Sequence, residues 1–305
     1  MSGGKIIVVC GSTASGKTAL AVDLAERYNG EVVSADSVAI YKGLDVGSAK
    51  PTKEETRGVK HYMIDVVSPF DEFSVSDYEN AALPIINDIL SRGKLPIICG
   101  GTGFYINSLL YKMSYGNSKG NTDIRNKYEK IAAEEGNEKV YEILKTVDPV
   151  TAEKLHPNDK MRVIRALEIF EASGIRKSDI KDEMIPRFNF IAIMPTYDRE
   201  TLYNRINKRV DGMFRNGLEE EVEGLLKSGL TLENQSMQGI GYKETAEAIL
   251  SGSDMPLDTI KLNTRHYAKR QITFFKRFRN LFSIDNSEND SFEKVCKIVD
   301  NFLKN

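Results

Sequence analysis

The chain has 305 residues, of which 41% are hydrophobic and 28% are charged, and its formal net charge is −2. This length and composition are typical of a globular protein with one large core and an added part, or with two domains. A net charge this close to zero excludes a surface that attracts nucleic acid everywhere. Any polyanionic partner must therefore meet a local cationic patch.

The sequence also limits the compartment in which the protein acts. No apolar run approaches the length that spans a bilayer, and the first five residues lead into an apolar segment without a signal-peptide pattern. The three cysteines, Cys10, Cys99 and Cys296, are far apart, and the first two end apolar segments. We expect reduced, buried thiols and no zinc site. We also expect a cytoplasmic monomer with no membrane partner.

A phosphate-binding loop opens the chain. Apolar β-branched residues at 6–9 predict a strand, which leads into the pattern G-x-x-x-x-G-K-[ST] and then into a helical pattern. In this order the backbone N–H groups converge on an anion. Gly11 and Gly16 allow torsions closed to other residues, Lys17 supplies a positive charge, and the Thr18 hydroxyl can hold Mg²⁺. The candidate phosphate-binding residues are Gly11, Ser12, Thr13, Ala14, Ser15, Gly16, Lys17 and Thr18. A glycine-rich turn without a ligand is the alternative.

Strand and helix patterns alternate through the first hundred residues. The predicted strands are 6–9, 32–35, a short one ending at 63–65, and 96–99. A capping-box spacing from Ser76 to Glu79, followed by helical apolar periodicity, predicts a crossover helix that ends at Gly93. Such alternation predicts a parallel sheet with ligands at the carboxyl ends of its strands, where the loop, Asp36 and Thr102 all fall.

From about residue 122 the pattern is helical only, and a strand pattern then returns. The predicted segments are helices at 127–146 and 162–172 and a strand at 188–194. We predict an α/β protein: a P-loop NTPase-like parallel sheet flanked by helices, with an all-helical insertion. The predicted domains are the core, 1–121 with 188–305, and the insertion, 122–187.

Two later helical segments carry cations. One places Leu202, Ile206, Val210 and Met213 inward, which puts Arg205 and Arg209 together on another face. The other, residues 261–279, holds seven Lys or Arg and no acidic residue, with aromatic residues interleaved. This second segment is either a solvated amphipathic helix or a contact surface for nucleic-acid phosphates.

Taken together, the motifs of this chain resemble those of the bacterial tRNA dimethylallyltransferases. The matching segments are 11–18, 34–37, 40–42, 47–51, His61 with Asp65, 100–103, 156–159 with Arg162, 165–168, 239–243 and 269–273. Each motif is weak alone, except the phosphate loop, but the ordered set is specific. The chain departs from the residues common in that family at Ser12, Ala39, Met161 and Phe274.

The resemblance implies a chemistry for the loop. It would bind the diphosphate of dimethylallyl diphosphate, with Mg²⁺ and Lys17 stabilising charge as pyrophosphate leaves. The acceptor would be N6 of the adenosine adjacent to the anticodon, a poor nucleophile for which Asp36 fits as general base. Thr102 would orient substrate, and Arg209 would bind diphosphate from the opposite side. The alternatives are a helix N-cap or outer-sphere Mg²⁺ contact for Asp36, a turn hydroxyl for Thr102 and a surface ion pair for Arg209.

The resemblance also implies which residues meet the tRNA anticodon stem-loop, whose acceptor base must be extruded to react. The expected set comprises Asp36, Ser37, Val38, Ala39, Thr102, Arg125, Met161, Arg162, Val163, Ile164, Arg165, Lys269 and Arg270. The insertion would close over the anticodon arm. Arg162 and Arg165 are surface charges in the alternative interpretation.

Other functions stay open at this stage. A P-loop kinase for a small metabolite would use Lys17 and Mg²⁺ on ATP, but it leaves the cationic segment unexplained. An isopentenyltransferase acting on free adenine nucleotide differs only in its acceptor. A non-catalytic RNA-binding protein is disfavoured by the presence of Lys17, Thr18 and Asp36.

Overall fold

The computed structural model describes residues 4–114, 121–181 and 184–305. The chain divides into two compact units: Met1–Leu110 with Pro186–Asn305, here called the core unit, and Tyr111–Ile185, here called the helical unit. The first boundary thus lies earlier than residue 121, where the helical pattern alone placed it, because the core ends with the helix α4 (Gly103–Leu110).

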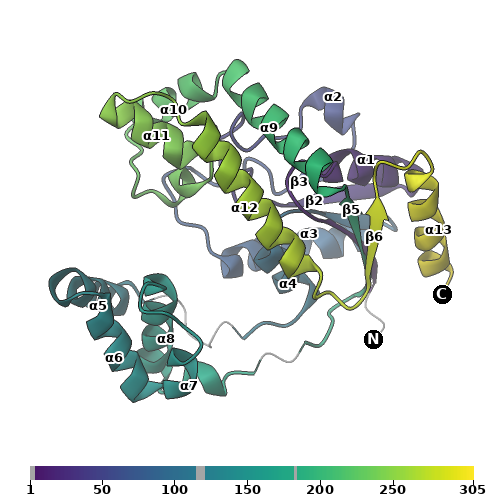
Figure 1. Ribbon diagram of the computed structural model, residues 1–305. Coiled ribbons are helices and arrows are strands. Elements are labelled where there is room, and N and C mark those ends of the chain that lie inside the picture. The colour runs from purple at the N-terminus through teal and green to yellow at the C-terminus, as the bar shows by residue number, and fades with distance from the viewer. Residues whose placement is uncertain (1–3, 115–120, 182–183) are drawn as a thin grey trace. The chain divides into compact units, whose positions relative to one another are not determined.

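The core unit contains one six-stranded parallel sheet in the order β3-β2-β4-β1-β5-β6 (Figure 1). Its strands are β1 (Lys5–Cys10), β2 (Gly30–Ala35), β3 (His61–Tyr62), β4 (Leu95–Gly100), β5 (Asn189–Thr196) and β6 (Leu281–Asp285). The predicted fold class is confirmed. The predicted end of the short strand at 63–65 is wrong, because Met63 and Asp65 take φ angles of 61° and 56°, which end the extended pairing.

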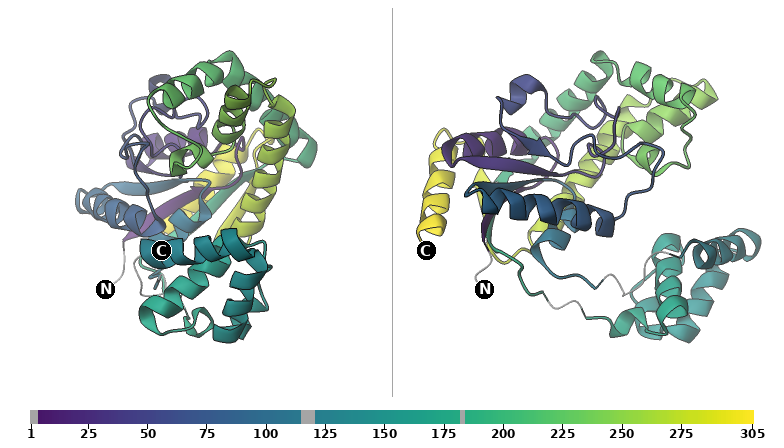
Figure 2. Two further views of the ribbon diagram at one scale, coloured as in Figure 1. Left: turned by 90° about the vertical axis from the view of Figure 1, so that its left-hand side faces the viewer. Right: turned by 180° about the vertical axis from the view of Figure 1, so that it is seen from behind.

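Helices cover both faces of the sheet (Figure 2). On one face α1 (Lys17–Arg27) and α13 (Ser291–Lys304) bury apolar side chains against β1, β2, β4 and β5. On the other, α3 (Val75–Ser91) and α4 contact β2 and β4, and the buried Tyr78 hydroxyl donates to the Ser34 carbonyl at 2.8 Å. Strands buried on both faces explain the continuous apolar runs in the sequence.

The start of α3 differs from the sequence prediction. Ser74 caps the helix, and the capping box runs from Ser74 to Asp77 rather than from Ser76 to Glu79. Both spacings satisfy the pattern, but Glu79 is used elsewhere, in an ion pair with Arg187 beside β5. The helix therefore begins two residues earlier than the spacing predicted, and Glu79 serves a tertiary contact instead of a cap.

The remaining core helices follow β2 and β5. They are α2 (Lys53–Thr56), α9 (Arg199–Arg215), α10 (Leu218–Lys227), the 3₁₀ turn η3 (Gln235–Gln238), α11 (Tyr242–Ser251) and α12 (Leu257–Phe275). As predicted, α9 buries Leu202, Ile206 and Val210. Helices α9 and α12 pack side by side, as the views of the ribbon also show.

The helical unit has its own apolar core, built around Leu144, Val163 and Leu167. Its elements are α5 (Thr122–Glu135), α6 (Asn137–Val147), α7 (Pro149–Ala152), α8 (Lys160–Ser173) and the 3₁₀ turn η2 (Lys177–Asp179). The single helix predicted at 127–146 is wrong, because Gly136, with φ of 91°, separates α5 from α6. Nowhere in the described ranges is a helix long and apolar enough to cross a membrane.

Candidate active site

The phosphate loop connects β1 to α1, as the sequence predicts. Gly11, Ala14 and Gly16 take φ angles of 143°, 60° and 89°, which fold the loop back over the strand end. Lys17 begins α1, and its Nζ donates to the Ser12 carbonyl at 2.5 Å. Such a loop presents backbone N–H groups and a helix N-terminus to one point in space, which is an arrangement that binds anions.

A cavity of about 380 Å³ lies beside this loop, within the core unit. Lys17, Asp36 and Arg209 all line it, so the structure brings together three charged residues that are far apart in the sequence. Burial lowers the pKa of Lys17, and the nearby positive charge of Arg209 lowers it further. Burial also lowers the pKa of Arg209, while the Asp36 carboxylate opposes that shift. Arg270 also lines the cavity, so three cations and one carboxylate give it an excess of positive charge.

Asp36 caps the turn that follows β2. Its Oδ1 accepts hydrogen bonds from the amides of Val38 and Ala39 at 2.9 and 3.1 Å. This is the turn-capping role that such residues commonly play. It occupies one carboxylate oxygen, so the second oxygen is not required for the turn. Asp36 therefore has both a fixed position and an oxygen to spare at the cavity wall.

Thr102 joins the carboxyl ends of β2 and β4. Its Oγ1 accepts from the Ser37 amide at 3.1 Å and donates to the Ser37 hydroxyl at 3.2 Å. Gly100 must be glycine here, because a Cβ would lie 2.1 Å from the Ala35 carbonyl oxygen. Thr102 thus sets the position of the turn that carries Asp36.

Gln271 of α12 was not singled out by the sequence analysis, although it lies within one of the quoted motifs. Its Oε1 accepts from the Thr13 amide at 2.9 Å, and its Nε2 donates to the Gly101 carbonyl at 2.9 Å. A single buried side chain therefore ties the phosphate loop to the end of β4. Next to it, burial raises the pKa of Tyr267, which lines the cavity, to about 12.

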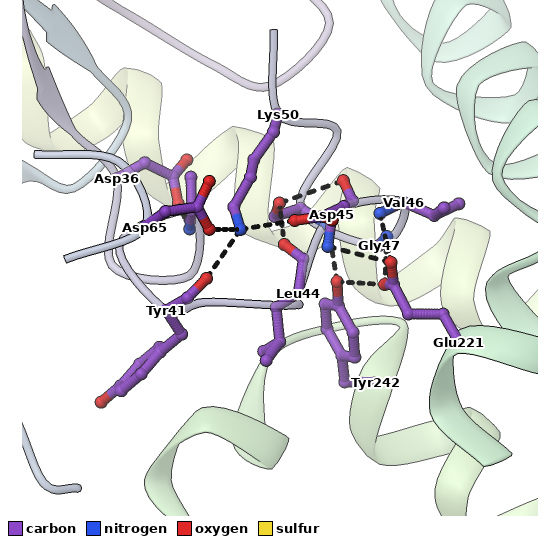
Figure 3. Close-up of polar contacts among 12 residues, drawn as sticks. Asp36, Tyr41, Leu44, Asp45, Val46, Gly47, Lys50, Asp65, Glu221 and Tyr242 are labelled. Carbon is purple, nitrogen blue, oxygen red and sulfur yellow. Dashed lines mark hydrogen bonds and ion pairs between the residues drawn. The ribbon is translucent and has the colours of Figure 1, made fainter. Parts of the chain in front are cut away.

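The loop of residues 44–50, here called the clamp loop, holds Arg209 in place. Arg209 Nη2 donates to the Ser48 carbonyl at 3.1 Å. The loop is gripped in turn by Glu221 of α10, whose carboxylate accepts from the amides of Asp45, Val46 and Gly47 at 2.9, 2.8 and 3.2 Å (Figure 3). Carboxylates that accept several backbone amides fix a loop strongly, because each bond is charge-assisted.

Tyr242 of α11 and Lys50, the last residue of the clamp loop, make further contacts that hold this loop (Figure 3). The Tyr242 hydroxyl donates to Glu221 at 2.6 Å and accepts from the Ser48 amide at 3.2 Å. The Tyr242 ring packs on Gly47, where a Cβ would lie 2.5 Å from it. The Lys50 side chain is only 8% exposed, and its Nζ donates to the Tyr41 carbonyl at 2.7 Å and to Asp45 at 2.6 Å. No local sequence pattern links these residues to Arg209.

The side chains of Arg205 and Arg209, both on α9, contact different parts of the core unit. Arg205 is exposed, its Nε donates to the Ala14 carbonyl at 2.8 Å, and its guanidinium lies 4.5 Å from the centre of the Tyr197 ring. It braces the outside of the phosphate loop and does not line the cavity. Only Arg209 of this pair faces the position of an anion on the loop.

Most of the residues expected to face RNA in the core unit are accessible, but Ala39 is only 5% exposed. Ser37, Val38 and Ala39 line the cavity, as does Arg270 of α12. Lys269 and Arg270 are exposed. Elsewhere in the cationic segment, Lys261 pairs with Asp211 at 2.6 Å and Arg265 with Asn207 at 3.0 Å. The segment is thus partly structural, with its exposed charges in its second half.

In the helical unit, the expectation that Val163 and Ile164 face the RNA is wrong. Val163 and Ile164 are 1% and 2% exposed and belong to the apolar core, so their side chains do not face a ligand. The helical period turns these two positions inward while Met161, 69% exposed, and Arg162 stay at the surface.

Arg125 and Arg165 are both committed to Glu168. The buried Glu168 carboxylate lies 2.9 Å from the Arg165 guanidinium and 3.6 Å from that of Arg125. Burial disfavours its charged form, but hydrogen bonds from Arg165 and from the Asn121 amide outweigh burial and lower its pKa. Arg125 and the Asn121 amide thus tie the start of α5 to α8, whereas the pair of Arg165 with Glu168 lies within α8.

Comparison with known proteins identifies the family. A model of the IPP transferase family matches residues 39–278. The chain belongs to this family. A tRNA dimethylallyltransferase of Acetivibrio thermocellus is 47% identical over 304 residues, covering 98% of this chain and 97% of the relative. Another, of Caldanaerobacter subterraneus, is 49% identical over 288 residues, covering 90% and 89%.

Solved structures of IPP transferase relatives agree with the fold. The tRNA isopentenylpyrophosphate transferase of Bacillus halodurans is 37% identical, covers 98% of this chain and 97% of its own, and gives a TM-score of 0.73. A eukaryotic dimethylallyltransferase described as acting on tRNA is 28% identical, covers 99% and 80%, and gives a TM-score of 0.84.

The clamp loop generates a prediction about anion binding. Glu221→Gln removes the charge and turns an amide NH₂ group toward backbone donors, so the clamp loop and its contact with Arg209 should loosen. We expect the affinity for inorganic pyrophosphate to fall about tenfold, since a hydrogen bond to a charged group contributes roughly 1.5–3 kcal/mol. Isothermal titration calorimetry measures this directly.

Glu220→Gln, on the same helix but exposed, is the matched control and should bind pyrophosphate like the wild type. Equal affinities for all three proteins would contradict the role given to the clamp loop.

Proposed function

We propose that this IPP transferase transfers a dimethylallyl group from dimethylallyl diphosphate to N6 of the adenosine adjacent to the anticodon in tRNA. The observation that carries the proposal is the cavity in which Lys17, Arg209 and Asp36 meet. Lys17 and Arg209 suit a diphosphate, which a single cation would neutralise poorly. Asp36 suits an acceptor that must lose a proton. The relatives named above support the acceptor and the donor.

The proposed reaction is one substitution at the allylic carbon C1. The bond from C1 to the diphosphate oxygen breaks, and its electron pair leaves with pyrophosphate, whose growing charge Lys17 and Arg209 stabilise. The bond from N6 to C1 forms. Asp36 accepts the proton that N6 loses, so the product amine is neutral. Arg209 can act at a fixed distance because the clamp loop holds it.

The residues present also fit a divalent cation. Thr18, the exposed second residue of α1, lines the cavity on the side of the phosphate loop. Across the described part of the chain, no group of three His, Cys, Asp or Glu side chains could hold a metal ion. A cation here would be held by the Thr18 hydroxyl together with diphosphate oxygens, the mode that Mg²⁺ prefers. Mg²⁺ so bound would supply further charge stabilisation to the leaving group.

The RNA would reach the cavity over α12. Arg270 lines the cavity and is exposed, and Lys269, Lys276 and Arg277 are exposed beside it. We propose that these side chains contact the phosphates of the anticodon stem-loop, and that Met161 and Arg162 of the helical unit also face the RNA. The helical unit would then serve as an RNA-binding domain.

An assay of the acceptor tests the proposal. Wild-type protein incubated with dimethylallyl diphosphate, Mg²⁺ and either unmodified tRNA or AMP should add the prenyl mass to tRNA only. Asp36→Asn keeps the shape of the side chain and removes the base, so kcat should fall by roughly 10²-fold or more with little change in tRNA affinity. Mass spectrometry and single-turnover kinetics measure these quantities.

Prenylated AMP would instead assign the free nucleotide as acceptor, and ADP formation from ATP with a small metabolite would support a kinase. A loss in Asp36→Asn confined to tRNA affinity would reassign Asp36 to positioning.

The cationic face of α12 gives a second prediction. If Lys269 and Arg270 contact phosphates, log affinity for tRNA should fall linearly with log salt, and Lys269→Ala or Arg270→Ala should each flatten that slope by about one unit. Lys227→Ala, which removes an exposed cation paired with Glu223, is the control and should keep the wild-type slope. Fluorescence anisotropy over a salt series gives the slopes. Wild-type slopes in both α12 variants would mean that the RNA lies elsewhere.

A further inference from the structure

An exposed aromatic ring lies beside the end of β4. Phe104, the second residue of α4, is 64% exposed, although its ring is among the largest apolar groups of the chain. It follows Thr102 by two residues and follows Gly101, which lines the cavity, by three. One exposed apolar side chain is common on protein surfaces, so the surroundings of Phe104 decide its role.

The Phe104 ring has a rigid support on its inner side. Its centroid lies 5.5 Å from that of Phe274 of α12, at an interplanar angle of 59°. Phe274 packs on Gly103, where a Cβ would fall 2.3 Å from the ring, and it contacts Phe275 and Phe278 edge-on. Phe275 and Phe278 are buried. The aromatic residues of the cationic segment therefore form a packed support. Phe104 packs on this support, and its own ring is exposed to solvent.

The pair of rings continues the wall of the cavity. Tyr267, Arg270 and Phe274 are spaced i, i+3 and i+7 along α12, so they share one face of the helix. Tyr267 and Arg270 line the cavity, and Phe274, further along the same face, contacts Phe104. A polymer with one unit inside the cavity would place its next unit near this end of the face.

The chemistry around the rings selects the occupant. Exposed cations Lys269, Arg270 and Arg277 lie on or directly after α12, which suits a polyanion. An unpaired nucleobase has a flat π-face that stacks on aromatic side chains, and its phosphates pair with such cations. We infer that Phe104, supported by Phe274, is a stacking platform for one nucleobase that flanks the acceptor adenosine. This inference rests on the proposed function, and it adds a specific contact for the extruded loop.

The test uses an anticodon stem-loop with 2-aminopurine at each position flanking the acceptor in turn. Stacking on Phe104 should quench the fluorescence at one of these positions in the wild type, and Phe104→Ala should abolish the quenching. Phe104→Ala should also weaken RNA binding by about 5- to 100-fold, the range expected for the loss of one base–aromatic stack. Phe104→Trp should restore binding, whereas Phe104→Leu, which is apolar but has no π-face, should not.

An abasic nucleotide at the quenched position completes a double-mutant cycle. Its effect should disappear in Phe104→Ala, because both changes remove the same contact. Phe282→Ala, which removes an exposed ring from β6, is the control and should bind and prenylate RNA like the wild type. Affinity for dimethylallyl diphosphate should stay unchanged in every variant.

Two failures are distinguishable. If the wild type prenylates the stem-loop while Phe104→Ala binds it equally well, or if the effects of the abasic nucleotide and Phe104→Ala are additive, the platform is wrong and the proposed function stands. If the wild type leaves the stem-loop unmodified, the proposed function fails, and this inference fails with it.

Discussion

The structure depends on keeping two positive charges, Lys17 and Arg209, in one partly buried cavity. Burial of like charges is unfavourable, and it lowers the pKa of both groups. The arrangement is tolerable because each cation is held by a backbone carbonyl, that of Ser12 for Lys17 and that of Ser48 for Arg209. An anionic ligand would relieve the repulsion, so the cavity is preorganised to bind further negative charge.

The two loops that hold these cations are themselves fixed by distant parts of the chain. Gln271 fixes the phosphate loop to the end of β4, and Glu221 fixes the clamp loop. Both supports belong to helices that follow β5, whereas the loops that they hold precede β4. The site therefore requires the whole core unit to fold, because the phosphate loop and the clamp loop are both held by side chains from helices that follow β5.

Local patterns predicted the parts of the site that depend on local physics. The phosphate loop could be predicted because glycines that allow unusual torsions come directly after an apolar strand. Asp36 could be predicted as a site residue because it lies at the end of β2. The spacing from Ser76 to Glu79 misplaced the cap of α3, which is Ser74, and Glu79 forms an ion pair with Arg187 that the local pattern does not show. No local sequence pattern indicated a role for Glu221 or Phe104. Their roles arise from contacts with Gly47 and Phe274, which lie far away in the sequence.

The expectation for residues 161–165 shows a further limit. The resemblance implied that all five residues of this segment face the RNA. A helix exposes only part of its circumference, however, and Val163 and Ile164 lie in the apolar core. Arg165 and Arg125 compensate the buried Glu168 and therefore have a structural role that a motif cannot reveal.

We propose that the cation pair binds the diphosphate independently of the RNA. Calorimetric titration of Lys17→Ala with dimethylallyl diphosphate and, separately, with tRNA separates the two kinds of binding. Diphosphate binding should be lost or weakened at least tenfold, while tRNA affinity should stay within a few-fold of the wild type. Normal diphosphate affinity together with lost tRNA binding would contradict it.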